Sequence, residues 1–266
     1  MRLYRDRFEG LRSLFSGLRT NLVVDSIIDG NTPAWVYADA ADSPRSAWTW
    51  DRQDAVLFAG TPDPGLVETL REVVLPDAQS RWIPELCLFT SSAEWEEVLR
   101  EGLPGLRITP AQRLRFCYSG KHPAWRDLLP EGFSLRRMDA YLLHNSDLLN
   151  VDQMAGWVSS FWESDDSFFR TGFGYCVIEE DTVVSWCLTV FASTNQRELG
   201  LATVPGRRGR GLAAVTATAC LEHCDRAGLT PHWHCWADNA PSSAVALHVG
   251  FIEPEPYEVL RLRLRD

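Results

Sequence analysis

Residues 197–214 read Arg-Glu-Leu-Gly-Leu-Ala-Thr-Val-Pro-Gly-Arg-Arg-Gly-Arg-Gly-Leu-Ala-Ala, and this stretch is the most informative of the chain. An apolar segment at 198–204, typical of a strand, leads into a loop with three glycines and three arginines, and a helical pattern follows to about residue 227. Glycines let a backbone approach a ligand closely, and the N–H groups at a helix start favour an anion. Arg207, Arg208 and Arg210 add charge that suits phosphates. The stretch therefore predicts a phosphate-binding strand–loop–helix unit.

Two phosphate-binding motifs fit this loop. Residues 209–214 satisfy the G-x-G-x-x-A form of the dinucleotide fingerprint, with Asp238 at the end of the next predicted strand, although this acid lies further along than is usual. Residues 208–213 satisfy R/Q-x-x-G-x-G/A, and they resemble the pyrophosphate loop of the GNAT superfamily of N-acetyltransferases. A Walker loop is excluded, because no Gly-Lys-Ser/Thr sequence is present.

A second pattern downstream decides between the two motifs. Asn239 stands eleven residues before Gly250 and twelve before Phe251, with Ser242 between them. This resembles the N-x-x-[S/A]…G-[F/Y] helix that follows the fifth strand of GNAT enzymes and flanks the coenzyme. Over about 130–260 the chain is similar to the acetyltransferase group typified by the zwittermicin A resistance protein.

The resemblance implies an α+β fold with a mixed α/β sheet. We expect a GNAT acyltransferase fold in the C-terminal half and a smaller mixed α/β lobe in the N-terminal half, for which a degenerate GNAT-like domain is one interpretation. A polar, proline-containing stretch at about 119–132 is the expected boundary. It gives an N-terminal lobe at 1–125, without a coenzyme motif, and a GNAT N-acetyltransferase domain at 126–266. No internal repeat stands out in the sequence.

Apolar periodicity and turn residues predict the individual elements. Helices are expected at 5–19, 62–75, 91–100, within 139–172, to about 227 after the arginine loop, and at 241–249. Strands are expected at 22–28, 34–38, 55–59, 85–90, 134–138, 173–179, 183–191, 198–204, 230–236 and about 251–264. The tryptophans of the N-terminal half are expected in a core or an interface.

By the resemblance, the chain uses acetyl-CoA as cosubstrate. Main-chain groups of Ala202, Thr203 and Val204 would hold the pantetheine arm and the acetyl carbonyl where two central strands splay apart. The pyrophosphate would lie on Arg208, Gly209, Arg210, Gly211, Leu212 and Ala213. Asn239 and Ser242 would contact the coenzyme from the last helix.

Glu198 is the predicted general base, because an attacking amine must be neutral and many GNAT enzymes carry a glutamate at the start of this strand. The alternative is an edge carboxylate that pairs with Arg197 or with solvent. Many GNAT enzymes protonate the leaving thiolate with a tyrosine seven residues after the asparagine, and here that position is Ala246. His248 is a substitute if it does not lie on the outer face of the helix, and water is the other source of this proton.

Charge and composition limit the partners. The formal net charge of −10 and the pI of about 5.1 argue against a nucleic-acid partner. No apolar run is long enough to cross a bilayer, and neither a signal peptide nor a membrane partner is expected, so a cytoplasmic location is predicted. Residues 139–198 hold 10 acids and 2 bases, and they correspond to the acceptor side of GNAT folds. Acids in this stretch would steer a cationic amine toward the acceptor site, and the alternative is a plain solvated face. These acids are Asp147, Asp152, Glu163, Asp165 and Asp166.

Metal binding is not expected. Five residues invite a zinc hypothesis, namely His223, Cys224, His232, His234 and Cys235, but their spacing matches no common zinc pattern. His232 and His234 alternate with Trp233 as strand residues do. The seven cysteines contain no CxxC pair and are expected to be reduced thiols.

The sequence thus predicts an acetyl-CoA-dependent N-acetyltransferase that acts on a small-molecule amine, such as a cationic amine or an aminopolyol antibiotic, by direct attack on the thioester. A catalytically weak CoA-binding regulatory or interaction protein is the alternative, because the tyrosine is missing. A dinucleotide-binding oxidoreductase is the third interpretation. The acceptor, the oligomeric state and the role of the N-terminal lobe stay open.

Overall fold

The computed structural model describes residues 2–3, 5–18, 22–145 and 147–265. The chain forms two compact units. The first unit contains residues 1–112 and 257–266, and the second contains residues 113–256. We describe each unit by itself.

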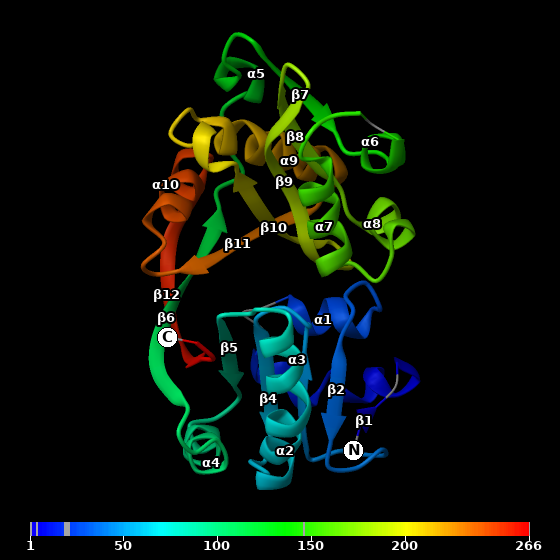
Figure 1. Cartoon of the computed structure of the whole chain (residues 1–266), viewed down its shortest axis with the longest axis vertical. Helices are drawn as coiled ribbons and strands as arrows, with labels where there is room; N and C mark the ends of the chain where they lie inside the picture. Colours follow the sequence, from blue (N-terminus) through cyan, green and yellow to red (C-terminus); the bar gives the residue numbers. More distant parts are fainter. Residues whose placement is uncertain (1, 4, 19–21, 146, 266) are drawn as a thin grey trace. The chain divides into compact units, whose positions relative to one another are not determined.

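The first unit is a mixed sheet with short helices (Figure 1). Its strands are β1 (Arg2–Leu3), β2 (Trp35–Ala38), β3 (Ser46–Trp50), β4 (Ala55–Gly60), β5 (Glu85–Thr90), the start of β6 (Arg107–Tyr118) and the end of β12 (Phe251–Arg263). Its helical segments are η1 (Arg5–Leu11), η2 (Leu14–Leu18), α1 (Val23–Ile28), α2 (Pro64–Thr69), η3 (Leu70–Val74), α3 (Leu75–Ser80) and α4 (Glu94–Gly102).

The second unit is also a mixed sheet, and it carries longer helices. Its further strands are β7 (Phe133–Arg137), β8 (Gly174–Glu179), β9 (Thr182–Ser193), β10 (Gln196–Thr203) and β11 (Thr230–Trp236). Its helical segments are α5 (Trp125–Leu128), α6 (Ala140–Asn145), α7 (Val151–Phe161), α8 (Asp165–Thr171), η4 (Pro205–Arg207), α9 (Leu212–Ala227) and α10 (Ala240–His248).

The two sheets have the same strand order and the same strand directions. In the first unit β1, β2, β3 and β4 pair antiparallel in turn, β4 pairs parallel with β5, and β5 pairs antiparallel with β12. In the second unit β7, β8, β9 and β10 pair antiparallel in turn, β10 pairs parallel with β11, and β11 pairs antiparallel with β6. The chain therefore contains a structural repeat, which the sequence does not reveal.

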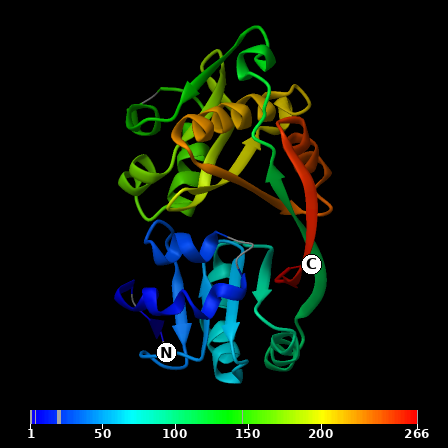
Figure 2. The ribbon, with the colours of Figure 1, turned by 180° about the vertical axis from the view of Figure 1, so that it is seen from behind.

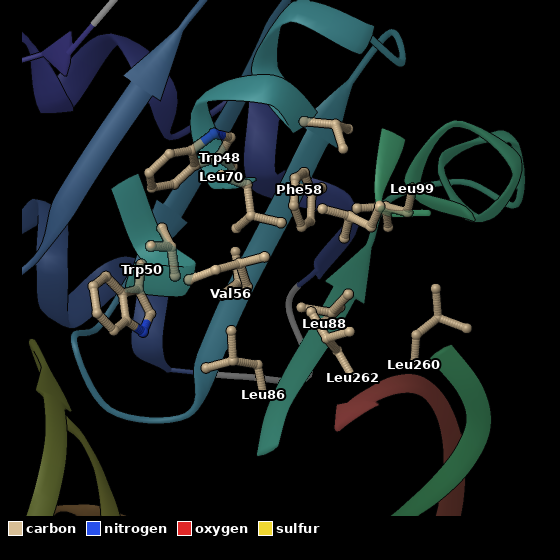
Figure 3. Packing of buried hydrophobic residues seen from close by; sticks show 14 of the residues in the cluster. Trp48, Trp50, Val56, Phe58, Leu70, Leu86, Leu88, Leu99, Leu260 and Leu262 are labelled. Atoms are coloured by element: carbon tan, nitrogen blue, oxygen red, sulfur yellow. The ribbon is translucent and has the colours of Figure 1, made fainter. Parts of the chain in front are cut away.

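The core of the first unit is built from aromatic and aliphatic side chains of the central strands (Figure 3). Trp48 and Trp50 of β3 are fully buried with Val56 and Phe58 of β4. The Trp48 indole N–H donates to the Leu66 carbonyl at 3.0 Å, so its polar atom is satisfied inside the core. The core position predicted for tryptophans holds for Trp48, Trp50 and Trp95, which is also fully buried.

In the second unit, α9 and α7 cover opposite faces of the sheet (Figures 1 and 2). The α9 face holds a core cluster that includes Leu199 of β10, Cys220 of α9 and Trp233 of β11. On the α7 face, the Trp157 ring meets Trp186 of β9 with ring centroids 6.0 Å apart. Alternate residues of β10 and β11 therefore belong to two different environments.

Several sequence expectations need correction. Residues 22–28, predicted as a strand, contain helix α1, because the run of Val and Ile is short and does not distinguish the two periods. The helix predicted at 5–19 is two 3₁₀ helices, η1 and η2, and its last residue lies outside the described residues. Strand β3 and strand β6 were not predicted. Trp82, expected in a core or an interface, is not in a core: it is 77% exposed beneath the Arg265 guanidinium.

The chain passes from the first unit to the second within β6, between Gln112 and Arg113, and returns within β12, between Pro256 and Tyr257. The end of β6, a strand that begins in the first unit, thus pairs with β11 in the sheet of the second unit. The end of β12, a strand that begins in the second unit, pairs with β5 in the sheet of the first. The division into domains 1–125 and 126–266 stays a prediction, and the compact units are divided at different residues.

Candidate functional site

The central feature of the second unit is a strand that changes its partner. β11 pairs parallel with β10 at three positions, of which Glu198 and His232 are the last. From Trp233 onward, β11 pairs instead with β6, beginning opposite Phe116. Beyond Glu198 the edge of β10 that faced β11 is therefore open, and the two strands diverge.

A cavity of about 550 Å³ lies at the open end of these strands. Its walls come from the end of β10, the arginine loop, the start of α9 and one face of α10. The predicted coenzyme residues that line it are Ala202, Thr203, Arg208, Gly209, Gly211, Leu212, Ala213, Asn239 and Ser242. Two further lining residues, Arg207 and His248, were considered in the sequence analysis for phosphate binding and for proton donation. The lining residues that sequence reasoning missed are Leu201, Ala214, Pro241, Ala244 and Val245. A helical period of three to four residues would have identified the lining face of α10.

Two predicted residues lie outside this lining. The Val204 N–H donates to the Val184 carbonyl of β9 at 3.0 Å, so this group faces away from the open edge. Arg210 stacks over the Phe133 ring at 5.2 Å and contacts Glu179. The structure brings together the other nine predicted residues, and their contact with a coenzyme stays a prediction.

The glycines of the loop have the conformation that only glycine adopts easily. Gly209 has φ of +76° and Gly211 has φ of +79°, and a Cβ added at either position would meet no atom within 4 Å. Gly211 is the N-cap residue of α9 and provides no side-chain cap. The first N–H groups of this helix are therefore left for another acceptor, and the space above the glycines is open to it.

The three loop arginines have different partners. Arg207 and Arg210 both contact the Glu179 carboxylate at the end of β8, the second at 3.2 Å. The Arg207 contact is the main reason that the pKa of Glu179 is lowered. The Arg208 Nε donates to the Thr203 carbonyl at 3.2 Å, and within the described part of the chain no carboxylate pairs with Arg208. Arg208 is thus the loop cation most available to a phosphate.

Asn239 and Ser242 also have structural roles. The Asn239 carboxamide oxygen accepts from the Ser242 N–H at 3.1 Å and so caps α10. The Ser242 hydroxyl accepts from the Trp233 indole N–H at 3.1 Å. These bonds fix the start of α10 against β11, and they hold the cavity-lining face of the helix in place.

The equivalent elements of the first unit form no such site. β4 and β5 are paired from Ala55 opposite Cys87 to Phe58 opposite Thr90, so the two strands do not diverge there. The helix that follows β4 is capped by Asp63, whose carboxylate accepts from the Gly65 N–H at 2.8 Å. At the start of α2 a carboxylate of the chain therefore occupies the place where an anion would bind.

Glu198 is buried, with 6% of its surface exposed. It lies at the last paired position before the strands diverge, opposite Phe191 of β9 and His232 of β11. Arg197, the alternative partner, is also buried, and its guanidinium donates to the carbonyls of Thr171 and Gln196 at 2.9 and 2.7 Å. The side chain of Arg197 is thus bound to backbone carbonyls.

The position of the missing tyrosine does not face the cavity. Ala246 is fully buried in the core cluster with Val249 and Phe251. The cavity is lined instead by Ala244, Val245 and His248. His248, for which an outer-face position was considered, therefore lies at the wall of the predicted coenzyme site.

The residues of the zinc hypothesis lie on different faces of the sheet. Trp233 and Cys235 of β11 pack into the α9 core cluster, so His232 and His234 project from the opposite face. His223 of α9 stacks on Phe173 with ring centroids 3.9 Å apart. In the described ranges, no group of three or more His, Cys, Asp or Glu side chains is arranged to hold a metal ion.

The acids of residues 139–198 are spread over the surface. Asp147, Asp152, Glu163 and Asp166 are exposed, and the half-buried Asp165 lies 2.6 Å from the Nε2 atom of His144. This distribution favours the plain solvated face over a steering cluster. Of the helices in the described residues, none is both long and apolar enough to cross a membrane.

In this unit two neighbouring strands diverge, and a glycine–arginine loop joins one of them to a helix without a side-chain cap. This fold and this site are those of an acyltransferase. Comparison with known families matches residues 12–260 to the GNAT acetyltransferase family, and the chain belongs to it. The match spans both units, and it decides against the dinucleotide interpretation of the loop.

Relatives agree with this assignment. The chain is 28% identical over 258 residues to the uncharacterized N-acetyltransferase YdfB of Bacillus subtilis, covering 97% of this chain and 96% of YdfB. It resembles the crystal structure of a GCN5-related N-acetyltransferase-like protein from Streptococcus suis with a TM-score of 0.75 and 20% identity, covering 97% and 99% of the two chains. A tandem GNAT protein from the clavulanic acid biosynthesis pathway matches with a TM-score of 0.57 and 13% identity, covering 98% of this chain and 96% of that chain.

Proposed function

We propose that the protein is an acetyl-CoA-dependent N-acetyltransferase, that its catalytic unit is the second one, and that its acceptor is the amine of a small molecule. The observation that carries this proposal is the divergence of β10 and β11 beyond Glu198, with a cavity at their open end that reaches an uncapped helix N-terminus. Membership of a group similar to the zwittermicin A resistance protein, an aminopolyol antibiotic as acceptor, and a cytoplasmic location stay predictions.

The residues present fit acetyl-CoA. The open space above Gly209 and Gly211, the free N–H groups of α9 and the Arg208 guanidinium together suit a diphosphate. Backbone groups of Leu201 and Thr203 lie on the open edge of β10, because alternate residues of a strand point their hydrogen-bonding groups to the same side and Val204 points to β9. When bound, the coenzyme supplies an activated acetyl thioester.

Glu198 would take the proton of the incoming ammonium. An amine attacks a thioester only in its neutral form, and a carboxylate within hydrogen-bond reach is a suitable base. Glu198 lies at the last paired position before the strands diverge, and its register with Phe191 of β9 puts it on the α7 face of the sheet. Trp157, Phe161 and Phe191 gather on that face, with ring centroids of Phe161 and Phe191 5.6 Å apart.

The test is turnover. The protein is incubated with acetyl-CoA and a panel of amines, and released thiol is measured. We expect thiol release with at least one amine, and a loss of kcat of about 100-fold in Glu198→Gln, which keeps the size of the side chain but cannot accept the proton. Glu180→Gln, which alters an exposed glutamate of the same unit, is the matched control and is expected to keep full activity.

A second candidate function is a coenzyme-binding protein with little or no catalysis. The burial of Ala246, where many relatives carry the tyrosine acid, favours it. It predicts coenzyme binding that Glu198→Gln leaves unchanged, and no thiol release with any amine.

A further inference from the structure

A buried base has to return its proton to water, and Glu198 has little direct access to it, with 6% of its surface exposed. The position beside it on β11 is His232. Paired residues of neighbouring strands lie about 4.8 Å apart across the ladder and project to the same face of the sheet. The residues that follow, Leu199 and Trp233, both pack in the α9 core cluster, so Glu198 and His232 share the opposite face.

His232 is half-buried, and one nitrogen of its imidazole is buried without a hydrogen bond. Its Nε2 atom is inaccessible to water, and no described residue donates to it or accepts from it. A buried polar atom without a partner is costly, and such an atom beside a reaction site commonly has a chemical role. An unprotonated Nε2 is able to accept a proton.

His232 also lies at the wall of a second cavity, of about 590 Å³. This cavity lies where β6 and β11 separate, before their pairing begins at Phe116 and Trp233. Its lining includes the exposed residues Ser119, Gly120 and Thr230, so it is open to solvent. The cavity therefore brings solvent to the wall that contains His232, at the edge of β11 away from Glu198.

We propose that His232 is a positioning residue that relays the amine proton from Glu198 to water in this second cavity. The inference rests on the proposed function. The ammonium transfers one proton to the Glu198 carboxylate and becomes a neutral amine. The carboxyl group passes that proton to His232, whose imidazolium then releases it to a water molecule, so that Glu198 and His232 both return to their starting states.

The surroundings of His232 suit a transient proton carrier. The charged or titratable groups around it are Glu198 on β10, His234 on its own strand with ring centroids 6.5 Å away, Arg115 and Cys117 on β6, and Tyr118 and Asp225 on the cavity wall. Burial, followed by the charge of Arg115, lowers the pKa of His232, so the imidazole is neutral near pH 7 and releases a proton readily. Asp225 accepts from the Tyr118 hydroxyl at 3.0 Å and lies 3.4 Å from the His122 Nε2 atom.

The experiment measures kcat for thiol release by wild type, His232→Ala and His234→Gln, with and without added imidazole, and coenzyme affinity by calorimetry. We expect His232→Ala to lose about tenfold in kcat or more, to bind acetyl-CoA normally, and to regain activity as imidazole enters the cavity. His234→Gln, which changes the next histidine on the same face, is expected to show no imidazole-dependent gain. Recovery by a small base separates a relay from a structural role.

Each outcome decides something. Full kcat in His232→Ala, or a loss that imidazole does not restore in a variant with native circular dichroism and normal coenzyme affinity, overturns the relay while the proposed function stands. If His232→Ala does not fold, His232→Gln takes its place, and a wild-type acid limb in its pH–rate profile overturns the relay. Absence of turnover in the wild type overturns both proposals.

Discussion

Gly211 and Asp63 occupy the same place in the two repeats, each at the start of the helix that follows the fourth strand of its sheet. Gly211 has no side chain and leaves the first N–H groups of α9 open, whereas the Asp63 carboxylate accepts from the Gly65 N–H of α2. The start of α9 thus favours an anion from outside the chain, whereas at the start of α2 the Asp63 carboxylate is itself the anion. This difference, with the continuous pairing of β4 and β5, is the reason that the coenzyme site is proposed in the second unit.

Glu179 neutralises part of the positive charge of the arginine loop. Its carboxylate contacts both Arg207 and Arg210, of which Arg207 lines the cavity. We expect Glu179→Gln to free these cations and to tighten coenzyme binding by about threefold at low salt, with the gain lost at high salt because exposed charges are screened. Calorimetry at two ionic strengths measures this. The neighbouring Glu180→Gln is the control, and weaker binding by Glu179→Gln would show that the carboxylate instead positions the arginines.

Restoring the tyrosine of other GNAT enzymes is expected to fail. Ala246 is fully buried against Val249 and Phe251, so the ring of Ala246→Tyr would have to displace core side chains. We expect a loss of about 2 kcal/mol in the free energy of unfolding and no gain in kcat. Ala244→Tyr places the same ring on the exposed cavity-lining face and is expected to change stability by less than about 0.5 kcal/mol. Urea unfolding compares the two, and a stable Ala246→Tyr with raised kcat would contradict the orientation of α10.

Stability is expected to fall as the pH drops below about 6.5. Burial lowers the pKa of His234 to about 3, so the folded protein keeps this side chain neutral while the unfolded chain takes up a proton. The unfolded state then binds more protons, and the free energy of unfolding decreases between the unfolded pKa near 6.5 and the folded pKa. We expect this residue to cost about 1 kcal/mol between pH 7.5 and 5.5.

Urea unfolding at the two pH values checks this expectation. His234→Gln should reduce the pH dependence, and His248→Gln, at an exposed histidine of the same unit, should leave it unchanged. If the free energy of unfolding of His234→Gln depends on pH as strongly as that of the wild type, groups other than His234 cause the loss of stability at low pH.

The sequence was most informative where local chemistry determines the structure. The glycines at positive φ, the arginine loop and the Asn239 cap are each encoded by residue type and spacing, and nine of the predicted coenzyme residues do line one cavity. The places of Arg210 and Val204 depend on β8 and β9, which lie more than ten residues away in the chain. Spacing within the motif could not supply those contacts.

The structural repeat and the Glu198–His232 pair depend on long-range pairing. β6 pairs with β11 and β12 pairs with β5, and in both pairs the two strands lie far apart in the sequence. No local sequence pattern therefore identifies these partners. The strand prediction at 22–28 was wrong, because these residues contain helix α1. In such a short apolar run, tertiary packing decides the conformation and the sequence pattern does not. His232 first stood among the zinc candidates, and its relation to Glu198 emerged only from the register of β10 and β11.

Coenzyme binding by Gly211→Asp tests the central claim most directly. The substitution places a carboxylate at the start of α9, in the space where the diphosphate is proposed to lie. Gly132→Asp is the matched control, because Gly132 belongs to the same unit, has φ of +84°, and also has no atom within 4 Å of an added Cβ. By calorimetry we predict one CoA per wild-type chain, at least a tenfold loss of affinity in Gly211→Asp, and wild-type affinity in Gly132→Asp. Equal affinity in the two variants, or no binding by the wild type, would contradict the account.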